Sequence, residues 1–337
     1  MHTRLDRIKD WLAKTLPDAH FHGTATSEDA SFRRYFRVSR PDGESFVVMD
    51  APPEQEDSGP FVRVAALLRA VGVNAPEVLA MDLSQGFLLL SDLGTVHYLD
   101  VLDEKRVQRL YGDAMGALLA IQACVPCAEI PEYHDALLEQ EMRLFPDWFL
   151  VRHLGIRLTD ATRQTLQDTF AFLRIASDEQ PKAFVHRDYH SRNLMACARH
   201  NPGILDFQDA VLGPITYDLV SLLKDVYITW PEEQVEAWAL GHRDLAIQHG
   251  ILSEADPKTW LRWFDLMGVQ RHIKIVGIFA RLRHRDGKPG YLADIPRTLH
   301  YLRATCRRYP ELTAFGALLE ELQTDKPIQK PNRDQDL

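Results

Sequence analysis

The sequence predicts an α+β chain with a small β-rich N-terminal lobe and a larger helical C-terminal lobe. Strand patterns dominate before about residue 95, and helical periodicity dominates after it. The helical part is interrupted by one β-rich stretch, "FVHRDYHSRNLMACARHNPGILDFQDA", at residues 184–210. We therefore expect lobes at residues 1–93 and 94–325, followed by a polar, frayed tail at residues 326–337.

In the first lobe, "RYFRVSR" and "SFVVMD" flank "PDG" and predict a β-hairpin. "FVRVAALLRAVG" predicts a short helix, because its apolar residues Phe61, Val64, Ala65 and Leu68 share one face. Gly72 then stands where a C-terminal cap belongs. "GFLLLSDLG" predicts a buried strand that ends at Gly94 and leads into the second lobe.

In the second lobe, apolar residues recur at helical spacing along "DEKRVQRLYGDAMGALLAIQA". We expect further helices at residues 136–150, 160–177, 216–230, 231–249 and 257–282. Within the interrupting stretch, "AFVHRD" predicts a strand that enters a polar turn. "NLMACA" and "GILDF" predict two more strands, joined by the turn "RHNPG".

Composition excludes several classes of protein. The 337 residues carry a formal net charge of −9, which argues against general nucleic-acid binding. No apolar run is long enough to span a membrane. The four cysteines suggest no disulfide framework. We expect a cytoplasmic monomer with reduced thiols, whose partners are small molecules.

Three polar residues of the interrupting stretch carry its chemistry. Asp188 lies on a loop, Asn193 at the start of one predicted strand, and Asp206 at the end of the next. A hairpin would bring Asn193 and Asp206 together as the oxygen ligands that Mg²⁺ prefers. Asp188 could then face a substrate hydroxyl. A base and metal ligands are the parts that phosphoryl transfer requires.

"HRDYHSRN" followed by "LDF" resembles the pattern H-x-D-x-x-x-x-N…D-F of the aminoglycoside phosphotransferase and choline kinase family, which shares the protein-kinase fold. The resemblance covers both lobes and implies a two-lobed, protein-kinase-like fold. It implies that Asp188 is the catalytic base and that Asn193 and Asp206 hold Mg²⁺. Few residues separate "LDFQDA" from the next helix, so no long activation loop fits. We expect Arg187 to pair with a carboxylate near the site, such as Asp209.

Two features depart from the kinase pattern. The third strand, "FVVMDAP", has Met49 and Asp50 where a kinase carries a Lys, and the first helix has no acid to pair with one. The phosphate loop, "GTATSEDASFRRYFRV", has one glycine. We expect Arg33 or Arg34 to replace the missing Lys at the phosphates, although both could instead point to solvent.

With these departures, the chain resembles bacterial anomeric sugar kinases of cell-wall recycling. The stretches that carry this resemblance are "ASFRRYFRV", "VVMDAPPEQED", "GFLLLSDLG" and "QRHIKIVGIFARLRHRDGKPGYL". Those enzymes phosphorylate N-acetylmuramic acid and N-acetylglucosamine at the anomeric hydroxyl with ATP. The resemblance implies that ATP lies against the "LLLSDLG" connector, near backbone groups of Ser91 and Leu93. Val48 and Leu90 would sandwich the adenine.

A basic segment bears on the substrate. Residues 262–303 contain nine cations and three acids, which gives +6 in a chain of net charge −9. A site for polycationic aminoglycosides should be acidic instead. We expect Arg271 or Lys274 to meet the lactyl carboxylate of N-acetylmuramic acid, and Arg192 and Asp209 to contact the sugar. A solvated basic helix face is the alternative reading.

Two other functions stay open. One is a kinase for another small alcohol, including an aminoglycoside. The other, of a different class, is a nucleotide-binding pseudokinase regulator, which the missing Lys makes worth considering. The joint presence of Asp188, Asn193 and Asp206 argues against it, because a pseudokinase has no need of a base.

Overall fold

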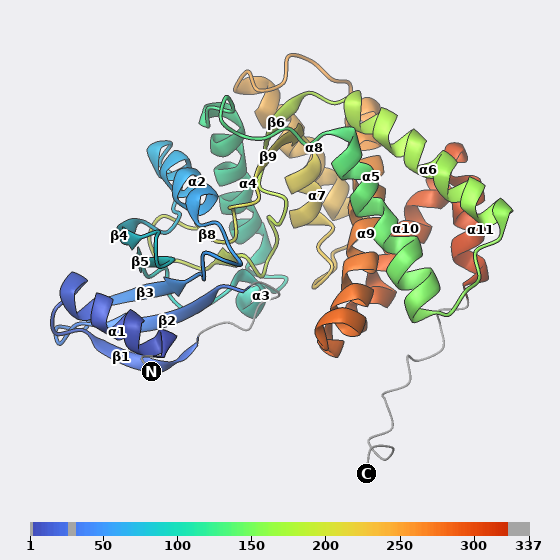
Figure 1. Ribbon diagram of the computed structural model, residues 1–337. Coiled ribbons are helices and arrows are strands. Elements are labelled where there is room, and N and C mark those ends of the chain that lie inside the picture. Colours follow the sequence, from blue (N-terminus) through green and yellow to red (C-terminus); the bar gives the residue numbers. More distant parts are fainter. Residues whose placement is uncertain (1–2, 26–31, 323–337) are drawn as a thin grey trace, which may run out of the picture. The chain divides into compact units, whose positions relative to one another are not determined.

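The computed structural model describes residues 3–25 and 32–322 of the chain (Figure 1). The chain divides into two compact units. The first comprises Met1–Pro131 and His186–Val211, and the second comprises Glu132–Val185 and Leu212–Leu337. The stretch with the kinase-like motif therefore belongs to the first unit. The lobe boundary expected at residues 93 and 94 stays a prediction, and the tail at 326–337 lies outside the described residues.

The first unit is built on a five-stranded antiparallel sheet with the order β1-β2-β3-β5-β4. The predicted hairpin is confirmed, because Val38 of β2 pairs with Phe46 of β3. The outer strands β1 and β4 were not predicted. The strands are β1 (His20–Ala25), β2 (Arg34–Ser39), β3 (Ser45–Asp50), β4 (Val78–Asp82) and β5 (Phe87–Ser91).

One face of this sheet packs on the N-terminal helix α1 (Arg4–Thr15), as Figure 1 shows. Ile8 and Leu12 of α1 are buried against Val38, Val48 and Leu89 of the sheet. Because successive side chains of a strand point to opposite faces, the neighbouring residues Val47 and Leu90 point the other way. The alternation thus separates a core face from a second face, on which a cavity opens.

A buried carboxylate fastens α1 to β3. Asp50 is fully buried, and Arg4 of α1 donates from Nε to its Oδ1 at 2.7 Å. Arg34 of β2 donates from Nε to its Oδ2 at 3.1 Å. Arg4 also lies 5.0 Å from the centre of the Phe87 ring. Two cations compensate the buried charge, as a carboxylate without water requires.

Three helices complete the first unit's framework. They are α2 (Gly59–Ala70), α3 (Tyr98–Val101) and α4 (Val107–Cys124). The predicted helix at 61–72 is therefore confirmed, and it begins two residues earlier. Gly72 has a φ of +80° and ends the helix, as its position suggested.

The strands of the motif stretch are shorter than expected. β7 (Leu194–Met195) and β8 (Gly203–Ile204) have two residues each, and they pair in an antiparallel hairpin. The strand predicted from "AFVHRD" is β6 (Lys182–Val185), which pairs with the unpredicted strand β9 (Val211–Pro214). The motif residues therefore lie on turns next to minimal strands.

The second unit is helical and is arranged around the long helix α9. Phe145, Phe149, Val276 and Leu299 are among the buried residues of its apolar core. Across the described residues, no helix combines the length and apolarity needed to cross a bilayer. The helices are α5 (Asp135–Leu144), η1 (Phe145–His153), α6 (Asp160–Asp178), α7 (Tyr217–Leu223), α8 (Glu232–Gln248), α9 (Pro257–Asp286), η2 (Pro289–Asp294), α10 (Ile295–Arg308), η3 (Pro310–Leu312) and α11 (Thr313–Glu321).

Two predicted helices differ from the structure. The helix expected at 216–230 ends at Leu223, because Asp225 accepts a hydrogen bond from Tyr227 N–H at 3.0 Å and forms a local turn instead. The helix expected at 136–150 changes to a π-helix at Phe145. Pro146 has no N–H for an α-helical bond, which accounts for the change of pitch there.

Candidate active site

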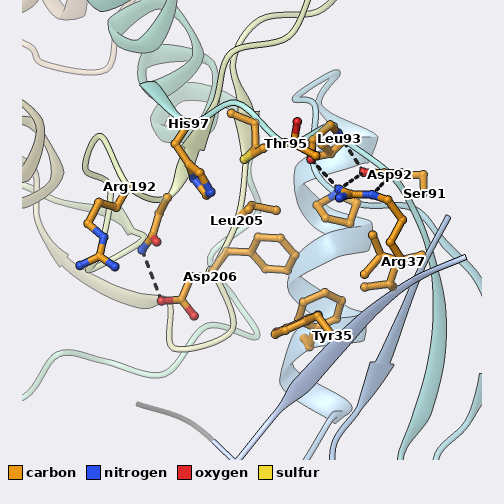
Figure 2. Close-up of a pocket in the computed structure, with 18 residues that line it drawn as sticks. Tyr35, Arg37, Ser91, Asp92, Leu93, Thr95, His97, Arg192, Leu205 and Asp206 are labelled. Carbon is orange, nitrogen blue, oxygen red and sulfur yellow. Dashed lines mark hydrogen bonds and ion pairs between the residues drawn. The ribbon is translucent and has the colours of Figure 1, made fainter. Parts of the chain in front are cut away.

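A cavity of about 240 Å³ opens in the first unit on the sheet face opposite α1. Four parts of this unit line it: strands β2 and β3, helix α2, the connector after β5, and the motif stretch. Figure 2 shows these side chains converging from both sides of the cavity. The cavity therefore brings the predicted connector and the predicted catalytic stretch together within one compact unit.

The walls of the cavity are apolar near the sheet. Val47 and Leu90 are cross-strand neighbours, and both line it. Phe61 of α2 and Phe207 add a ring pair with centroids 4.9 Å apart. Of the two residues expected beside an adenine, Leu90 lines the cavity. Val48 does not, because it is buried on the α1 face, and its neighbour Val47 lines the cavity instead.

The connector that follows β5 is held by an ion pair across the sheet. Arg37 of β2 donates from Nη2 to Asp92 Oδ1 at 2.9 Å and from Nε to Asp92 Oδ2 at 2.5 Å. Arg37 Nη2 also donates to the carbonyl of Gly94 at 2.8 Å (Figure 2). The pair raises the pKa of Arg37, and the pKa of Asp92 is lowered despite its burial. These contacts fix the backbone between Ser91 and Gly94.

A second contact holds the same connector from the hairpin side. The Cys197 thiol donates to the carbonyl of Leu93 at 3.4 Å. Ser91 N–H donates to the carbonyl of Glu77 at 3.0 Å, and Ser91 Oγ accepts from Glu77 N–H at 2.8 Å. Ser91 and Leu93 both line the cavity, as the nucleotide prediction requires. The sequence indicated these two residues but did not reveal the role of Arg37.

His186 ties the loop of Asp188 to the strand before Asp206. Its Nε2 lies 2.9 Å from the carbonyl of Leu205, and its Nδ1 accepts from Asp188 N–H at 3.3 Å. Burial lowers the pKa of His186 to about 4, so the ring is neutral near pH 7. A neutral ring that accepts at Nδ1 carries its proton on Nε2 and donates it to Leu205. His186 therefore positions Asp188.

Asn193 links the three residues of the motif. Its Nδ2 donates to the carbonyl of Asp188 at 3.0 Å and to Asp206 Oδ2 at 3.3 Å. Gln208 Nε2 donates to Asp206 Oδ1 at 2.8 Å. The structure thus brings Asp188, Asn193 and Asp206 together, as the spacing predicted. Asp206 has a φ of +62°, an uncommon conformation for a residue other than glycine that recurs at functional sites.

The oxygens of Asn193 and Asp206 fit a divalent cation. The Asn193 amide nitrogen is engaged, which leaves its carbonyl oxygen to face a metal, and Asp206 supplies a carboxylate. The described residues contain no group of three or more His, Cys, Asp or Glu that could hold an ion alone. A metal held here would take its remaining ligands from phosphate oxygens and water.

The residues proposed to replace the missing Lys do not both face the cavity. Arg34 lies on the α1 face of β2, where it is bound to Asp50 and not to the cavity. Arg33 is buried, and its Nη2 lies 3.0 Å from Glu56 Oε2. The tip of the phosphate loop, residues 26–31, lies outside the described residues. By strand alternation, Met49 lies on the cavity side of β3 and Asp50 on the α1 side.

Three further predicted residues belong to the motif stretch. Arg192 lines the cavity next to Asn193 and Asp206, at the end away from the connector (Figure 2). Arg187 Nη1 donates to the backbone carbonyl of Asp209 at 3.4 Å. The Asp209 carboxylate accepts from Gln208 Nε2 at 3.4 Å. Of the four residues predicted to contact the sugar, only Arg192 is a cavity residue in this unit.

Arg271 and Lys274 lie in the second unit, within a buried polar cluster on α9. Lys274 Nζ lies 3.2 Å from Glu141 Oε1 and donates to the Tyr217 hydroxyl at 3.1 Å. The Arg271 guanidinium lies 6.0 Å from the centre of the Tyr217 ring. Both cations are buried, so the prediction of a solvated helix face is wrong for these two residues.

Other cations of the basic segment are paired with acids at the surface. Arg262 lies 2.9 Å from Glu311, Arg297 lies 3.0 Å from Asp294, and Arg307, just beyond the segment, lies 2.8 Å from Glu320. Of these acids, Glu311 lies outside the segment and offsets part of its excess charge, whereas Asp294 belongs to the segment.

Comparison with known proteins identifies close relatives. The model of the phosphotransferase enzyme family matches residues 22–250. The chain is 47% identical to an N-acetylmuramate/N-acetylglucosamine kinase of Pseudomonas putida over 330 residues, covering 95% of this chain and 97% of the relative. It is also 47% identical to the kinase of the same name from Pseudomonas aeruginosa, over 95% of this chain and 97% of that one.

A solved structure agrees on the fold. The choline kinase LicA from Streptococcus pneumoniae aligns with a TM-score of 0.61 at 10% identity, covering 90% of this chain and all of that one. At this identity the match concerns the fold alone. The predicted protein-kinase-like α+β fold is confirmed.

Proposed function

Because the chain belongs to the phosphotransferase enzyme family, we propose that it is an ATP-dependent kinase of N-acetylated amino sugars. Its acceptors would be N-acetylmuramic acid and N-acetylglucosamine, phosphorylated at the anomeric hydroxyl. One structural observation carries the proposal: Asp188, Asn193 and Asp206 meet beside a cavity whose connector can hold a nucleobase. The sugar class follows from the nearly full-length relatives and their names.

Asp188 is proposed as the base. Its carboxylate would accept a hydrogen bond from the sugar hydroxyl and take the proton as the oxygen attacks the γ-phosphorus. His186 and Asn193 hold the backbone on both sides of this carboxylate. Since phosphoryl transfer depends mainly on positioning, these contacts would matter as much as the basicity of Asp188.

The nucleotide is proposed to lie in the cavity, with its base between Val47, Leu90 and the phenylalanine pair. Backbone groups of Ser91 and Leu93 would hydrogen-bond the edge of the adenine. Asn193 and Asp206 would hold Mg²⁺, which when bound neutralises phosphate charge. ATP use fits the family, and the identity of the metal is part of the proposal.

Arg192 is the cation that we propose for the phosphates. It lines the same cavity as the metal residues, whereas Arg34 faces α1. Arg33 would have to leave Glu56 to take this role. Contacts of Asp209, Arg271 and Lys274 with the sugar stay predictions.

An assay of ADP release across a panel of sugars tests the function. We expect turnover with N-acetylmuramic acid and N-acetylglucosamine, and little with kanamycin as the aminoglycoside control. Phosphorus NMR of the product should show a phosphate on the anomeric carbon. Asp188→Asn should keep nucleotide binding and lower kcat by about a hundredfold or more. Without sugar-dependent ADP release by the wild type, the proposal fails.

A further inference from the structure

His97 is a residue of the first unit's cavity to which the site described above gives no role. It is half-buried and lines the cavity, and in Figure 2 its ring points into the cavity toward Leu205. Among the described residues, neither ring nitrogen has a hydrogen bond of normal geometry. A polar side chain that faces a cavity without a protein partner is available to a ligand.

The surroundings of Nδ1 decide which ring nitrogen carries the proton. Nδ1 is buried and faces the first turn of α3, where backbone N–H groups point. A proton on Nδ1 would therefore be a buried donor without an acceptor, which costs free energy. We therefore assign the ring proton to Nε2. In this tautomer, His97 presents an N–H donor to the cavity.

The backbone that carries the His97 ring is held from two sides. Its N–H donates to Asp100 Oδ2 at 2.9 Å, and His97 pairs with Met195 of β7 in an isolated antiparallel bridge. The carbonyl of Val96, the residue before, accepts from Ala196 N–H at 2.8 Å. The ring therefore extends from a fixed point of the cavity wall.

This fixed point lies between the two ends of the cavity. His97 follows the connector three residues after Gly94, and its bridge partner Met195 lies two residues after Asn193. Figure 2 shows His97 between the connector on one side and Asp206 on the other. A nucleotide with its base at the connector and its phosphates at the metal residues would have its ribose at this intermediate position.

We propose that His97 binds the ribose of the nucleotide, with Nε2–H donating to a ribose hydroxyl oxygen. This inference deepens the proposed function and rests on it, because it requires a nucleotide in the cavity. A hydroxyl oxygen accepts such a hydrogen bond, whereas a hydrogen in its place does not. The protein therefore distinguishes ATP from an analogue that lacks this hydroxyl.

His97→Phe is the test variant, because it keeps an aromatic ring and removes the donor. The wild type should bind either 2′-deoxy-ATP or 3′-deoxy-ATP about three- to tenfold more weakly than ATP, the loss expected for one neutral hydrogen bond. In His97→Phe, ATP and that analogue should bind equally well. His97→Gln keeps a side-chain N–H donor and should restore part of the difference. Titration calorimetry with Mg²⁺ measures each dissociation constant without any sugar.

Tyr98→Phe is the matched control. Tyr98 does not line the cavity, and its hydroxyl accepts from Asn201 Nδ2 at 2.7 Å. This variant should lose stability and keep the wild-type ratio of the dissociation constants.

Two results would overturn the assignment of His97 and leave the proposed function standing. One is equal affinity of the wild type for ATP and both analogues. The other is a wild-type ratio in His97→Phe, since a defect of the fold alone weakens all three nucleotides by the same factor. If the wild type binds no ATP, the proposed function fails, and the assignment fails with it.

Discussion

The buried side chain of His242 on α8 should make the free energy of unfolding depend measurably on pH. Its ring is buried, and neither ring nitrogen has a hydrogen-bond partner among the described residues. It packs against Trp260, with centroids 6.4 Å apart. Burial lowers the pKa of His242 to about 4 from its ordinary value of 6.5. Between these two values the unfolded chain binds a proton that the folded chain does not.

The sign of the effect follows from this difference. The free energy of unfolding should be highest above about pH 6.5 and should fall as the pH drops toward 4. With these two pKa values, lowering the pH from about 7.5 to about 5.5 costs about 1 kcal/mol through His242 alone. His186 and His272, whose pKa values are lowered to about 4 and about 3, act in the same direction. Together the three histidines cost several kcal/mol over the same pH range.

His242→Leu tests how much of this loss of unfolding free energy at low pH comes from His242. The substitution removes a partnerless polar group, so stability at about pH 7.5 should stay the same or increase. Urea unfolding at both pH values should show a pH-dependent loss smaller by about 1 kcal/mol than in the wild type. Val235→Ala, at another buried position of α8, should lower stability without changing the pH dependence. An unaltered pH dependence in His242→Leu would refute the reasoning.

Three further predictions concern the nucleotide cavity and one helix contact. Arg37→Ala should raise the KM for ATP about tenfold or more and leave the sugar KM unchanged, because it removes the side chain that holds the connector. Steady-state kinetics with each substrate varied in turn measure both KM values, and an equal rise in both would contradict this role. Arg192→Ala should weaken ATP binding about ten- to a hundredfold, measured by titration calorimetry. Arg34→Ala should lower thermal stability and leave ATP affinity unchanged. A loss of ATP affinity in Arg34→Ala but not in Arg192→Ala would assign the phosphate role to Arg34. Gly277→Ala should lower the free energy of unfolding by about 1–3 kcal/mol, because its Cβ would lie 2.3 Å from the carbonyl carbon of Leu144. Gly241→Ala has open space around it and should raise the free energy of unfolding by up to about 1 kcal/mol. Equal effects of the two variants in urea unfolding would contradict this.

The sequence predicted the catalytic stretch well because the spacing of its polar residues is short. Asp188 and Asn193 are five residues apart, and one tight hairpin returns Asp206 to them. Local turn chemistry and a motif were therefore enough to place the three residues together.

Contacts between distant segments were not predictable in the same way. The sequence favoured Val48 over Val47 as the residue beside the adenine. The sequence alone does not show which face of β3 is covered by α1, and Val48 lies on that covered face. Arg37 and Asp92 are 55 residues apart, and only the register of the sheet shows that they meet. The early end of α7 depended on a single side-chain hydrogen bond, which competes with a helical pattern that is otherwise adequate.

The pairing of Asp50 with Arg4 has a practical consequence for shortened versions of the chain. A version that begins after α1 would keep every residue that lines the cavity of the first unit, yet it would remove one of the two cations beside a buried carboxylate. It would also expose the apolar face that Ile8 and Leu12 cover. Asp50 would keep Arg34 but lose the second of its two cations, so the free energy of unfolding should fall. A shortened chain without α1 should therefore yield less soluble protein, and α1 counts as part of the first unit's fold.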